Sequence, residues 1–310
     1  MLKRPMKAPT DPITDEELKS IHFPIVGSPK LDGFRCTIDE NGGHTSSMKP
    51  FTNRFVAETL RNPIYSGFDG EIVVGSPFKE DEDDDVFHRT SGPIRRFDGE
   101  PDFTLYTFDL WSQGEYSYKE RWLDNYHKLY KGIKSPNTRL VVLEQKLLKT
   151  TDEVIAYEKE MVELGYEGAM IRSLDGRYKE GRCTLREQNI FKRKPFEECD
   201  AEIIGFEEAM ENLNEKITDQ LTGLSHRSSH QANKRTKGTL GKFICRSPKW
   251  SVDQFSAGTG KGFTDAVKQD IWNNRENYIG SIVTIKYQKY GSIDRPRMPK
   301  VIKIREEWDL

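Results

Sequence analysis

Short runs of apolar residues, separated by polar residues and turn formers, dominate the first two thirds of the chain. Runs that are rich in β-branched and aromatic residues and broken by Gly or Pro predict β-strands. Such runs lie at residues 23–43 (strand, turn, strand), 68–75, 103–111, 168–173 and 189–196. This part of the chain therefore predicts mainly short strands.

Two segments show the wider spacing of a helix instead. Residues 117–133 end at Gly132, and their apolar face is expected from Trp122, Tyr126 and Leu129. In the second segment, Thr150 followed by Glu153 predicts a capping box, and Gly165 predicts the stop. The apolar face of this helix is expected from Val154, Ile155, Met161 and Leu164.

The composition changes after Pro195. Residues 200–209, 238–247, 278–291 and 298–308 predict the strands of a small β domain. Between them, residues 207–237 are polar and nearly free of aromatic side chains, which predicts a long mobile loop. We therefore expect two domains, at residues 1–196 and 197–310.

The charge is unevenly distributed. The formal net charge is -2, but residues 234–310 carry 16 Lys and Arg against 8 Asp and Glu, a net charge of +8. A basic C-terminal quarter predicts contact with a polyanion. The acidic run at residues 80–85 is interpreted as a solvated loop.

Membrane and disulfide-rich classes are disfavoured. No apolar run approaches the roughly 20 residues that span a bilayer, and the basic N-terminus lacks the apolar region of a secretory signal. The four cysteines are scattered without a CxxC pair, which argues against a zinc site and a disulfide framework. We expect a reduced, cytoplasmic protein without a membrane partner.

The segment SPKLDGFRC, residues 28–36, carries the first candidate chemistry. On an extended segment Lys30 and Asp32 share a face, while Leu31 points toward the core. Gly33 lets the backbone bend close to a ligand. An isolated KxDG is more often a surface salt bridge beside a turn, so this motif by itself is weak.

The segment resembles the nucleotidyl-acceptor motif KxDGxR of the covalent nucleotidyltransferases, which include ATP-dependent DNA ligases and mRNA capping enzymes. Further motifs of that family follow in the family's order: FDGEI, YTFDLW, YEGAMIR, FKRKP and RMPKVIKIREEW. FPIVGSPKLDGFR, SMKPFTNRF and GTGKGFTD resemble the small DNA ligases of bacteriophages. Each motif has a bland structural interpretation when it is taken alone, but six in order are hard to obtain by chance.

The resemblance implies a role for each matching residue. Lys30 would be the nucleophile, Glu71 would hold the ribose, Phe108 would pack on the purine, and Glu167 would help bind Mg²⁺ or Mn²⁺. The implied nucleotide-binding set is Lys30, Asp32, Arg35, Glu71, Phe108, Glu167, Lys192 and Lys194. The residues implied to orient pyrophosphate are Arg297, Lys303 and Arg305.

One departure concerns DNA contact. Ser46 stands where the family usually has an arginine that binds sugar or nick phosphate, while Lys49 and Pro50 fit the pattern. We expect Lys49 to contact DNA and Arg54 to substitute for the missing arginine.

The chemistry demands an unprotonated amine at Lys30, because a free lysine with a pKa near ~10.4 is almost wholly charged at pH 7. Crowding by Arg35, Lys192, Lys194 and a metal ion is expected to lower its pKa through like-charge repulsion. Lys192 and Lys194 alternate on a predicted strand, so both would face the phosphates.

The implied fold is α+β: a nucleotidyltransferase domain of the ATP-grasp-like DNA ligase type, with antiparallel sheets and helices, followed by an OB-fold β-barrel. The implied function is that of an ATP-dependent DNA ligase, which seals nicks in duplex DNA through a lysyl-AMP intermediate in DNA repair, replication and recombination. ATP and Mg²⁺ or Mn²⁺ would be the cofactors and nicked double-stranded DNA the partner. We expect a monomer, in the host cell cytoplasm if the chain is phage-encoded.

Four alternatives remain at this stage. A GTP-dependent mRNA capping guanylyltransferase would be labelled by GTP, and an RNA ligase would seal nicked RNA but not nicked DNA. An NAD⁺-dependent ligase is disfavoured because only 29 residues precede Lys30 and no cysteine quartet follows. A catalytically dead DNA-binding clamp would take up no covalent nucleotide.

Overall fold

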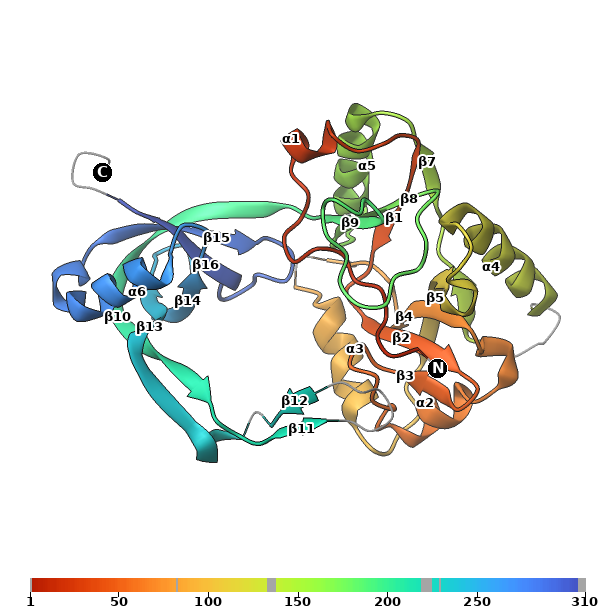
Figure 1. Ribbon diagram of the computed structural model, residues 1–310, viewed down its shortest axis with the longest axis horizontal. Coiled ribbons are helices and arrows are strands. Elements are labelled where there is room, and N and C mark those ends of the chain that lie inside the picture. The colour runs from red at the N-terminus through yellow and green to blue at the C-terminus, as the bar shows by residue number, and fades with distance from the viewer. Residues whose placement is uncertain (1, 82, 133–137, 219–224, 229, 306–310) are drawn as a thin grey trace. The chain divides into compact units, whose positions relative to one another are not determined.

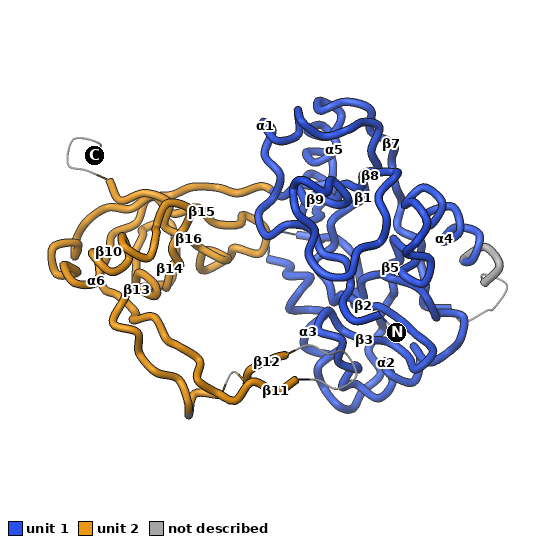
Figure 2. The backbone as a smooth tube through the Cα atoms, viewed as in Figure 1, with its two compact units in different colours: residues 1–194 blue, residues 195–310 orange. Residues whose placement is uncertain are grey.

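The computed structural model describes residues 2–81, 83–132, 138–218, 225–228 and 230–305, with only the backbone at 129–132, 226 and 232. The chain divides into two compact units, residues 1–194 and residues 195–310 (Figure 2). Within the described residues, no helix has both the length and the apolar character that crossing a bilayer requires.

The first unit contains two sheets (Figure 1). The five-stranded sheet runs in the order β3 (Gly42–His44), β2 (Phe34–Asp39), β4 (Phe68–Val74), β5 (Phe103–Leu110) and β6 (Leu140–Val142). The four-stranded sheet runs β7 (Lys146–Leu148), β1 (Ile25–Lys30), β8 (Gly168–Ser173) and β9 (Ile190–Arg193). All neighbours are antiparallel except β5 and β6, so the predicted strands and their sheet type are confirmed with that one parallel exception.

Helices and short 3₁₀ turns connect these strands. The helices of this unit are α1 (Asp15–Leu18), α2 (Arg54–Thr59), α3 (Val86–Arg95), α4 (Tyr118–Gly132) and α5 (Thr151–Glu163). The 3₁₀ turns among the described residues of both units are η1 (Pro63–Tyr65), η2 (Trp111–Gln113), η3 (Gln231–Asn233) and η4 (Arg275–Tyr278).

Helix α5 confirms the second predicted helix but corrects its details. Val154, Tyr157 and Met161 are buried and pack on strands β1 and β8. Ile155 and Leu164 were expected on this face but are exposed. Ile155 lies beside the row of positions i, i+3 and i+7 that meets the sheet, and Leu164 is the C-cap, after the last residue of the helix. The expected capping box is also incomplete. The Thr150 side chain accepts from the Glu153 N–H, but the Glu153 carboxylate accepts from the N–H of Lys149.

Helix α4 confirms the first predicted helix, but of its expected apolar face Trp122 is half-buried and Tyr126 is exposed. Tyr126 is 57% exposed, and the side chain of Leu129 lies outside the described residues. Among the α4 side chains that the structure describes, the buried ones are Tyr118, Arg121 and Asn125. Two of these three are polar, and hydrophobic periodicity does not mark polar residues as buried.

Arg121 forms a buried ion pair with Asp109 of strand β5. Its Nε lies 2.7 Å from Asp109 Oδ1, and both side chains are 1% exposed. The same guanidinium donates to the carbonyl oxygens of Tyr116 and Gly176. A buried charge is tolerated only when it is paired and hydrogen-bonded, and these contacts meet that requirement.

The second unit is a closed barrel in the order β10 (Phe196–Asn212), β13 (Lys234–Arg246), β14 (Phe255–Thr259), β16 (Arg297–Ile304) and β15 (Ile282–Gln288). Helix α6 (Asp265–Asn273) contributes Ile271 to its core, beside Phe243, Ile285 and Val301. The expected OB-type barrel is thus confirmed, and β14 is a strand that the sequence analysis did not name.

The predicted mobile loop at residues 207–237 is wrong for the residues that the structure describes. Strands β10 and β13 continue pairing to Asn212 and Lys234, and β11 (Lys216–Thr218) pairs with β12 (Ser225–Arg227) (Figure 1). The Asn214 side-chain amide donates to the carbonyl oxygens of Ser228 and His230. We call residues 207–218 and 225–237 the arm. Its polar composition misled the prediction because backbone pairing and side-chain amides hold it together, and neither requires apolar residues.

Replacing Arg121 with methionine is expected to destabilise the first unit by about 3–5 kcal/mol, because the Asp109 carboxylate would stay buried without its partner. Urea unfolding of the full chain, followed by circular dichroism, measures this change. Lys19→Met is the matched control, because Lys19 and its partner Glu16 are 66% and 83% exposed and such surface pairs contribute less than ~1 kcal/mol. Equal shifts in the two variants would contradict the prediction.

Candidate active site

Lys30 is the last residue of β1, an inner strand of the four-stranded sheet. Strand β8 pairs with β1 so that Lys30 is opposite Gly168, and the Glu167 N–H donates to the Lys30 carbonyl at 3.1 Å. Gly168 has φ +147, and a Cβ there would lie 2.2 Å from the Arg193 carbonyl oxygen of strand β9. Only glycine allows this approach, which brings the ends of the three strands together.

Glu167 lies between two lysines. Lys30 Nζ pairs with Glu167 Oε2, and Lys194 Nζ pairs with Glu167 Oε1 at 3.1 Å. The Glu167 side chain is 4% exposed, and both of its oxygens are satisfied. Although burial alone would raise the pKa of Glu167, the charges of Lys30 and Lys194 hold it well below its usual range.

The expected lowering of the Lys30 pKa is wrong in this structure. Burial does lower the pKa, but the carboxylates of Glu167, Glu71 and Asp32 outweigh it, so that the pKa of Lys30 is raised. The prediction considered the cations around Lys30 and overlooked the carboxylates that the same motifs bring in.

The basic residues on and just after strand β9 point to opposite faces of the sheet, because successive side chains of a strand alternate between the faces. Lys192 lines a cavity, and Lys194, just past the strand, bonds Glu167. Arg193 points the other way and pairs with Glu158 of α5 and Asp15 of α1. Burial and the neighbouring charges of Lys194, Lys30 and Arg182 lower the pKa of Lys192 to about 8.

The segment after Lys30 packs against the five-stranded sheet. The Gly33 N–H donates to Glu71 Oε1 at 3.1 Å, and a Cβ at Gly33 would lie 2.3 Å from the Ile72 carbonyl oxygen. Burial raises the pKa of Glu71 to about 7. Arg35 lies opposite Glu71 in the register but binds Asp69, with its Nε and Nη2 each 2.6 Å from a carboxylate oxygen. Glu71 and Arg35 thus both have protein partners in this structure.

A cavity of about 230 Å³ joins residues from both sheets. The predicted residues that line it are Lys30, Arg35, Glu71, Phe108 and Lys192. Phe108 is 5% exposed, and the guanidinium carbons of Arg35 and Arg172 each lie 4.7 Å from its ring centroid. The faces of a phenyl ring attract such cations, so the ring is held in place from within the first unit.

Three basic cavity residues were missed by the sequence analysis: Lys7, Arg172 and Arg182. Arg172 is 3% exposed and is the last residue of the YEGAMIR segment. The sequence could have pointed to it, because it is a basic residue within a recognised motif. Its Nε has no hydrogen-bond partner among the described residues. Lys7 and Arg182 belong to no recognised motif, and only folding brings them to the cavity.

Other predicted residues lie outside this cavity. Asp32 is 7% exposed and acts on Lys30 through its charge. Lys49 is exposed, and Arg54, at the start of α2, is 66% exposed and lies 3.6 Å from Asp98. Their expected roles toward nucleotide and DNA stay predictions.

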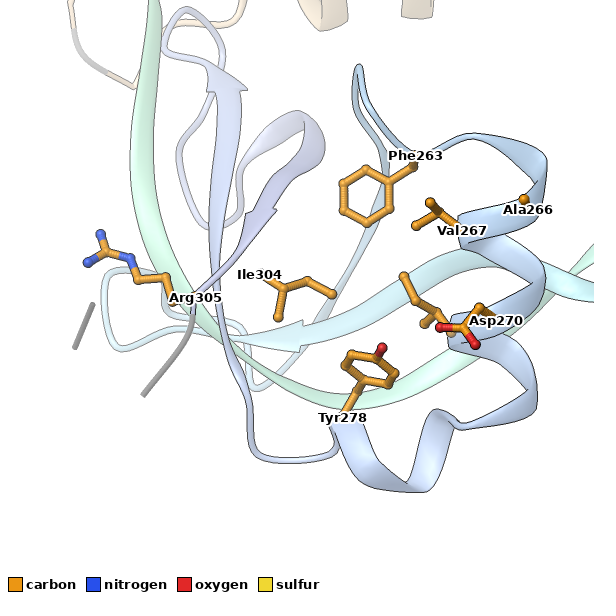
Figure 3. A pocket seen from close by; sticks show the side chains of 8 residues that line it. Phe263, Ala266, Val267, Asp270, Tyr278, Ile304 and Arg305 are labelled. Atoms are coloured by element: carbon orange, nitrogen blue, oxygen red, sulfur yellow. The ribbon is translucent and has the colours of Figure 1, made fainter. Parts of the chain in front are cut away.

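Arg297, Lys303 and Arg305 lie in the second unit, on β16 or directly after it. Arg305 pairs with Asp200 at 2.9 Å. It also borders a cavity of about 580 Å³ between α6 and the barrel, where the side chains of Phe263, Tyr278 and Ile304 converge (Figure 3). The guanidinium points away from these apolar side chains, and the expected role of the three residues toward pyrophosphate stays a prediction.

A family model described as the ATP dependent DNA ligase domain matches residues 5–194. A second model, the DNA ligase OB-like domain, matches residues 233–305. The chain belongs to the ATP-dependent DNA ligase family. The resemblance in the motifs is therefore confirmed at the level of the family, its two-domain fold and its enzyme class.

Solved structures agree with this assignment. The ligase is 25% identical to a Chlorella virus DNA ligase-adenylate, over 98% of this chain and 100% of that one, with a TM-score of 0.53. A second crystal structure of Chlorella virus DNA ligase-adenylate is 27% identical, covers 99% of both chains and has the same TM-score of 0.53. A structure from work on Lig E DNA ligases shares the fold, with 21% identity over 91% of this chain and 92% of that one and a TM-score of 0.63. No curated protein sequence matches the ligase.

Lys192 is expected to react with acetic anhydride with a midpoint near pH 8, well below the ~10.4 of an ordinary lysine. Burial and the surrounding cations disfavour its charged form, so the reactive neutral amine dominates above the lowered pKa. Mass spectrometry of the Lys192 peptide across a pH series measures the midpoint. A midpoint near pH 10 would disprove the assigned environment, and Lys30→Ala, which removes one repelling cation, should move the midpoint upward.

Proposed function

We propose that this ligase seals nicks in duplex DNA through a lysyl-AMP intermediate at Lys30. The observation that carries the proposal is the grouping of Lys30, Glu167 and Lys194 at the edge of a cavity lined by the other family motifs. Membership of the ATP-dependent DNA ligase family supplies ATP as the nucleotide. Capping and RNA-end joining have no comparable support and enter below as outcomes of the test.

Three group transfers make up the reaction. The Lys30 amine attacks the α-phosphorus of ATP, a P–N bond forms, and pyrophosphate leaves. The 5′-phosphate of the nick then attacks the adenylate phosphorus, and the lysine amine leaves. Finally the 3′-hydroxyl attacks that 5′-phosphorus, and AMP leaves as the strand closes.

The residues around Lys30 are arranged for the first transfer. Lys30 must lose a proton before attack, and its Nζ donates to Glu167 Oε2, a contact that orients the amine at the cavity. Lys192, which lines the cavity with Lys30, and Lys194 would neutralise the α-phosphate as its charge is redistributed. Phe108 would offer its ring edge or face to the purine, and Glu71 would bind the ribose.

The carboxylate of Glu167 fits the divalent metal that the reaction class requires. Mg²⁺ is commonly held by one or two carboxylates together with substrate phosphates and water. The described residues contain no group of three or more His, Cys, Asp or Glu side chains that would form an all-protein cage, which agrees with this mode. When bound, the metal would supply positive charge against the phosphates. Mn²⁺ would serve in the same place.

Contact with duplex DNA is proposed for the basic second unit. Residues 234–310 carry a net charge of +8, and OB-type barrels commonly bind nucleic acid. Lys234, Arg235 and Lys237 lie together at the arm end of β13, and the latter two are exposed. These side chains would contact backbone phosphates, which position the enzyme without reading sequence. Lys49 and Arg54 would add contacts from the first unit.

Lys30→Ala is expected to abolish covalent labelling of the protein by α-labelled ATP and Mg²⁺, because Lys30 lines the cavity and is the amine that the proposal places in attack on the α-phosphorus. Gel analysis and mass spectrometry measure the label. Lys19→Ala, at an exposed lysine, is the control and should label normally. Persistent label on Lys30→Ala would refute the nucleophile. Labelling by GTP or NAD⁺ alone, or sealing of nicked RNA but not nicked DNA, would refute the proposed substrates.

Binding to nicked duplex is expected to weaken steeply with salt, because each phosphate contact releases counterions. Replacing Lys234, Arg235 and Lys237 with glutamine should reduce the slope of log K against log salt by about 2–3, at roughly one unit for each lost contact. Fluorescence anisotropy between low and physiological salt measures the slope. The control is a triple variant in which Lys19, Lys146 and Lys159 of the first unit become glutamine. It removes the same amount of positive charge from outside the arm. A flat salt response, or equal slopes in the two triple variants, would contradict the arm contact.

A further inference from the structure

Strands β10 and β13 lose their regular pairing where the arm leaves the barrel. Ala209 of β10 lies opposite three residues of β13, at positions 237–239. A second register shift lies one step closer to the barrel, between Glu207 and Glu208. Bulges of this kind bend the strand that carries the extra residues and increase the local twist. The arm therefore joins the barrel through an irregular joint.

Two glycines of β13 allow this joint to form. Gly238, in the middle of the extra residues, has φ +65, a left-handed conformation that most other residues adopt only at a cost. A Cβ there would meet nothing within 4 Å, so the constraint at Gly238 is the backbone conformation and not the space. At Gly241 a Cβ would lie 2.8 Å from the Ala209 backbone nitrogen, so only glycine permits the close approach of the two strands.

Side chains bind both backbone polar groups of Gly238. The Gly238 N–H donates to Glu208 Oε1 at 2.6 Å, and Gln269 Nε2 donates to the Gly238 carbonyl at 2.7 Å. Within the described strands, the register gives Gly238 no opposite residue. The two side-chain bonds therefore take the place of ladder bonds at the joint. We call Glu208, Gly238 and Gln269 the clip.

The clip connects the arm to a well-packed part of the barrel. Gln269 lies on α6, which packs against β13 and places Ile271 in the barrel core. Gln269 also donates to Asn273 Oδ1 at 3.0 Å, which orients the amide on the helix surface. Leu240, two residues after Gly238, is 1% exposed in the same core. Helix and core thus fix one side of the joint.

We propose that the clip sets the direction in which the arm leaves the barrel and so positions the arm for duplex DNA. The inference rests on the proposed nick-sealing function, in which Arg235 and Lys237 contact backbone phosphates. Both side chains are exposed and come directly before Gly238 in the chain. A rotation of the backbone at Gly238 would therefore move both charges together.

A fixed direction favours binding because the cost of ordering the arm is met during folding. An arm that turned freely at the joint would lose that freedom on DNA, and the loss would weaken the affinity. Glu208 and Gln269 are positioning residues in this proposal, since they act through Gly238. The clip belongs to the second unit, and the nucleotide cavity is lined by residues of the first unit, so the clip is not expected to affect lysyl-AMP formation.

The test uses two pairs of variants. Gln269→Leu removes the donor with a side chain of similar size that suits a helix. Its control, Asn273→Ala, removes the other partner of the same amide and spares the clip. Gly238→Val places a β-branched residue in the left-handed conformation, and its control, Gly238→Asn, places there a residue that tolerates this conformation.

The direction of the arm is measured by pulsed electron spin resonance. Spin labels are attached at Glu215→Cys in the arm and Asp253→Cys on the barrel, both exposed positions. Cys199→Ala removes the half-buried native cysteine, and the other three are buried. Gln269→Leu and Gly238→Val should broaden the distribution of distances between the labels, and the two controls should match the wild type.

Fluorescence anisotropy of the unlabelled variants measures the affinity for nicked duplex, and labelling with ATP measures lysyl-AMP formation. Gln269→Leu and Gly238→Val are expected to bind nicked duplex about fivefold more weakly, the size of one net hydrogen bond. The rate of lysyl-AMP formation should stay at the wild-type value, because the joint is absent from the nucleotide cavity.

An unchanged distance distribution or an unchanged affinity in either clip variant would overturn the inference. Equal losses in the matched controls, or a proportionate loss of lysyl-AMP formation, would also overturn it, because the defect would then be general. If the wild type takes up no label from ATP or does not bind nicked duplex, the proposed function fails. If the wild type labels and seals while the clip variants keep its affinity, only this inference fails.

Discussion

The buried carboxylate of Glu167, shared between Lys30 and Lys194, is the interaction on which the rest of the site depends. Its two oxygens would be costly to bury without partners, and the two lysines would repel each other without it. The three residues meet because β8 lies between β1 and β9 in the sheet. A shift of one residue in either register would turn a lysine to the opposite face, so the sheet pairing and the site are specified together.

Two further polar pairs hold the surrounding parts of the site. Asp69 and Arg35 link the first sheet to the N-terminal segment through Met6 and Tyr178. Asp109 follows Phe108 on β5 and pairs with Arg121 of α4. Buried polar networks of this kind are costly when incomplete, so they favour one arrangement of the strands that carry the cavity residues.

Two different kinds of interaction stabilise the second unit. Its barrel has an apolar core that includes Phe243, Ile285 and Val301. The arm extends β10 and β13 beyond that core, and it relies on backbone pairing and on the amides of Asn212 and Asn214. A surface that carries little apolar burial and several basic side chains is suited to a hydrated polyanion such as DNA.

Sequence alone determined the features that depend on local pattern or on motif chemistry. The strand runs, the bounds of α4 and α5 and the family follow from period, turn residues and ordered motifs. The same motifs marked Lys30, Glu167, Lys192 and Lys194 as candidate site residues. Side chains at i and i+2 of a strand share a face whatever the tertiary context, so the alternation around Arg193 was also predictable.

Only the tertiary structure decided which groups from distant segments became neighbours. It showed that nearby carboxylates raise the pKa of Lys30, and that α4 buries Arg121 and Asn125. It also showed that β10 and β13 pair as far as Asn212 and Lys234, and that β11 pairs with β12. It also brought Lys7 and Arg182 to the cavity. The physical reason is that pKa shifts, buried ion pairs and backbone pairing depend on distances in space, and hydrophobic periodicity contains no information about those distances.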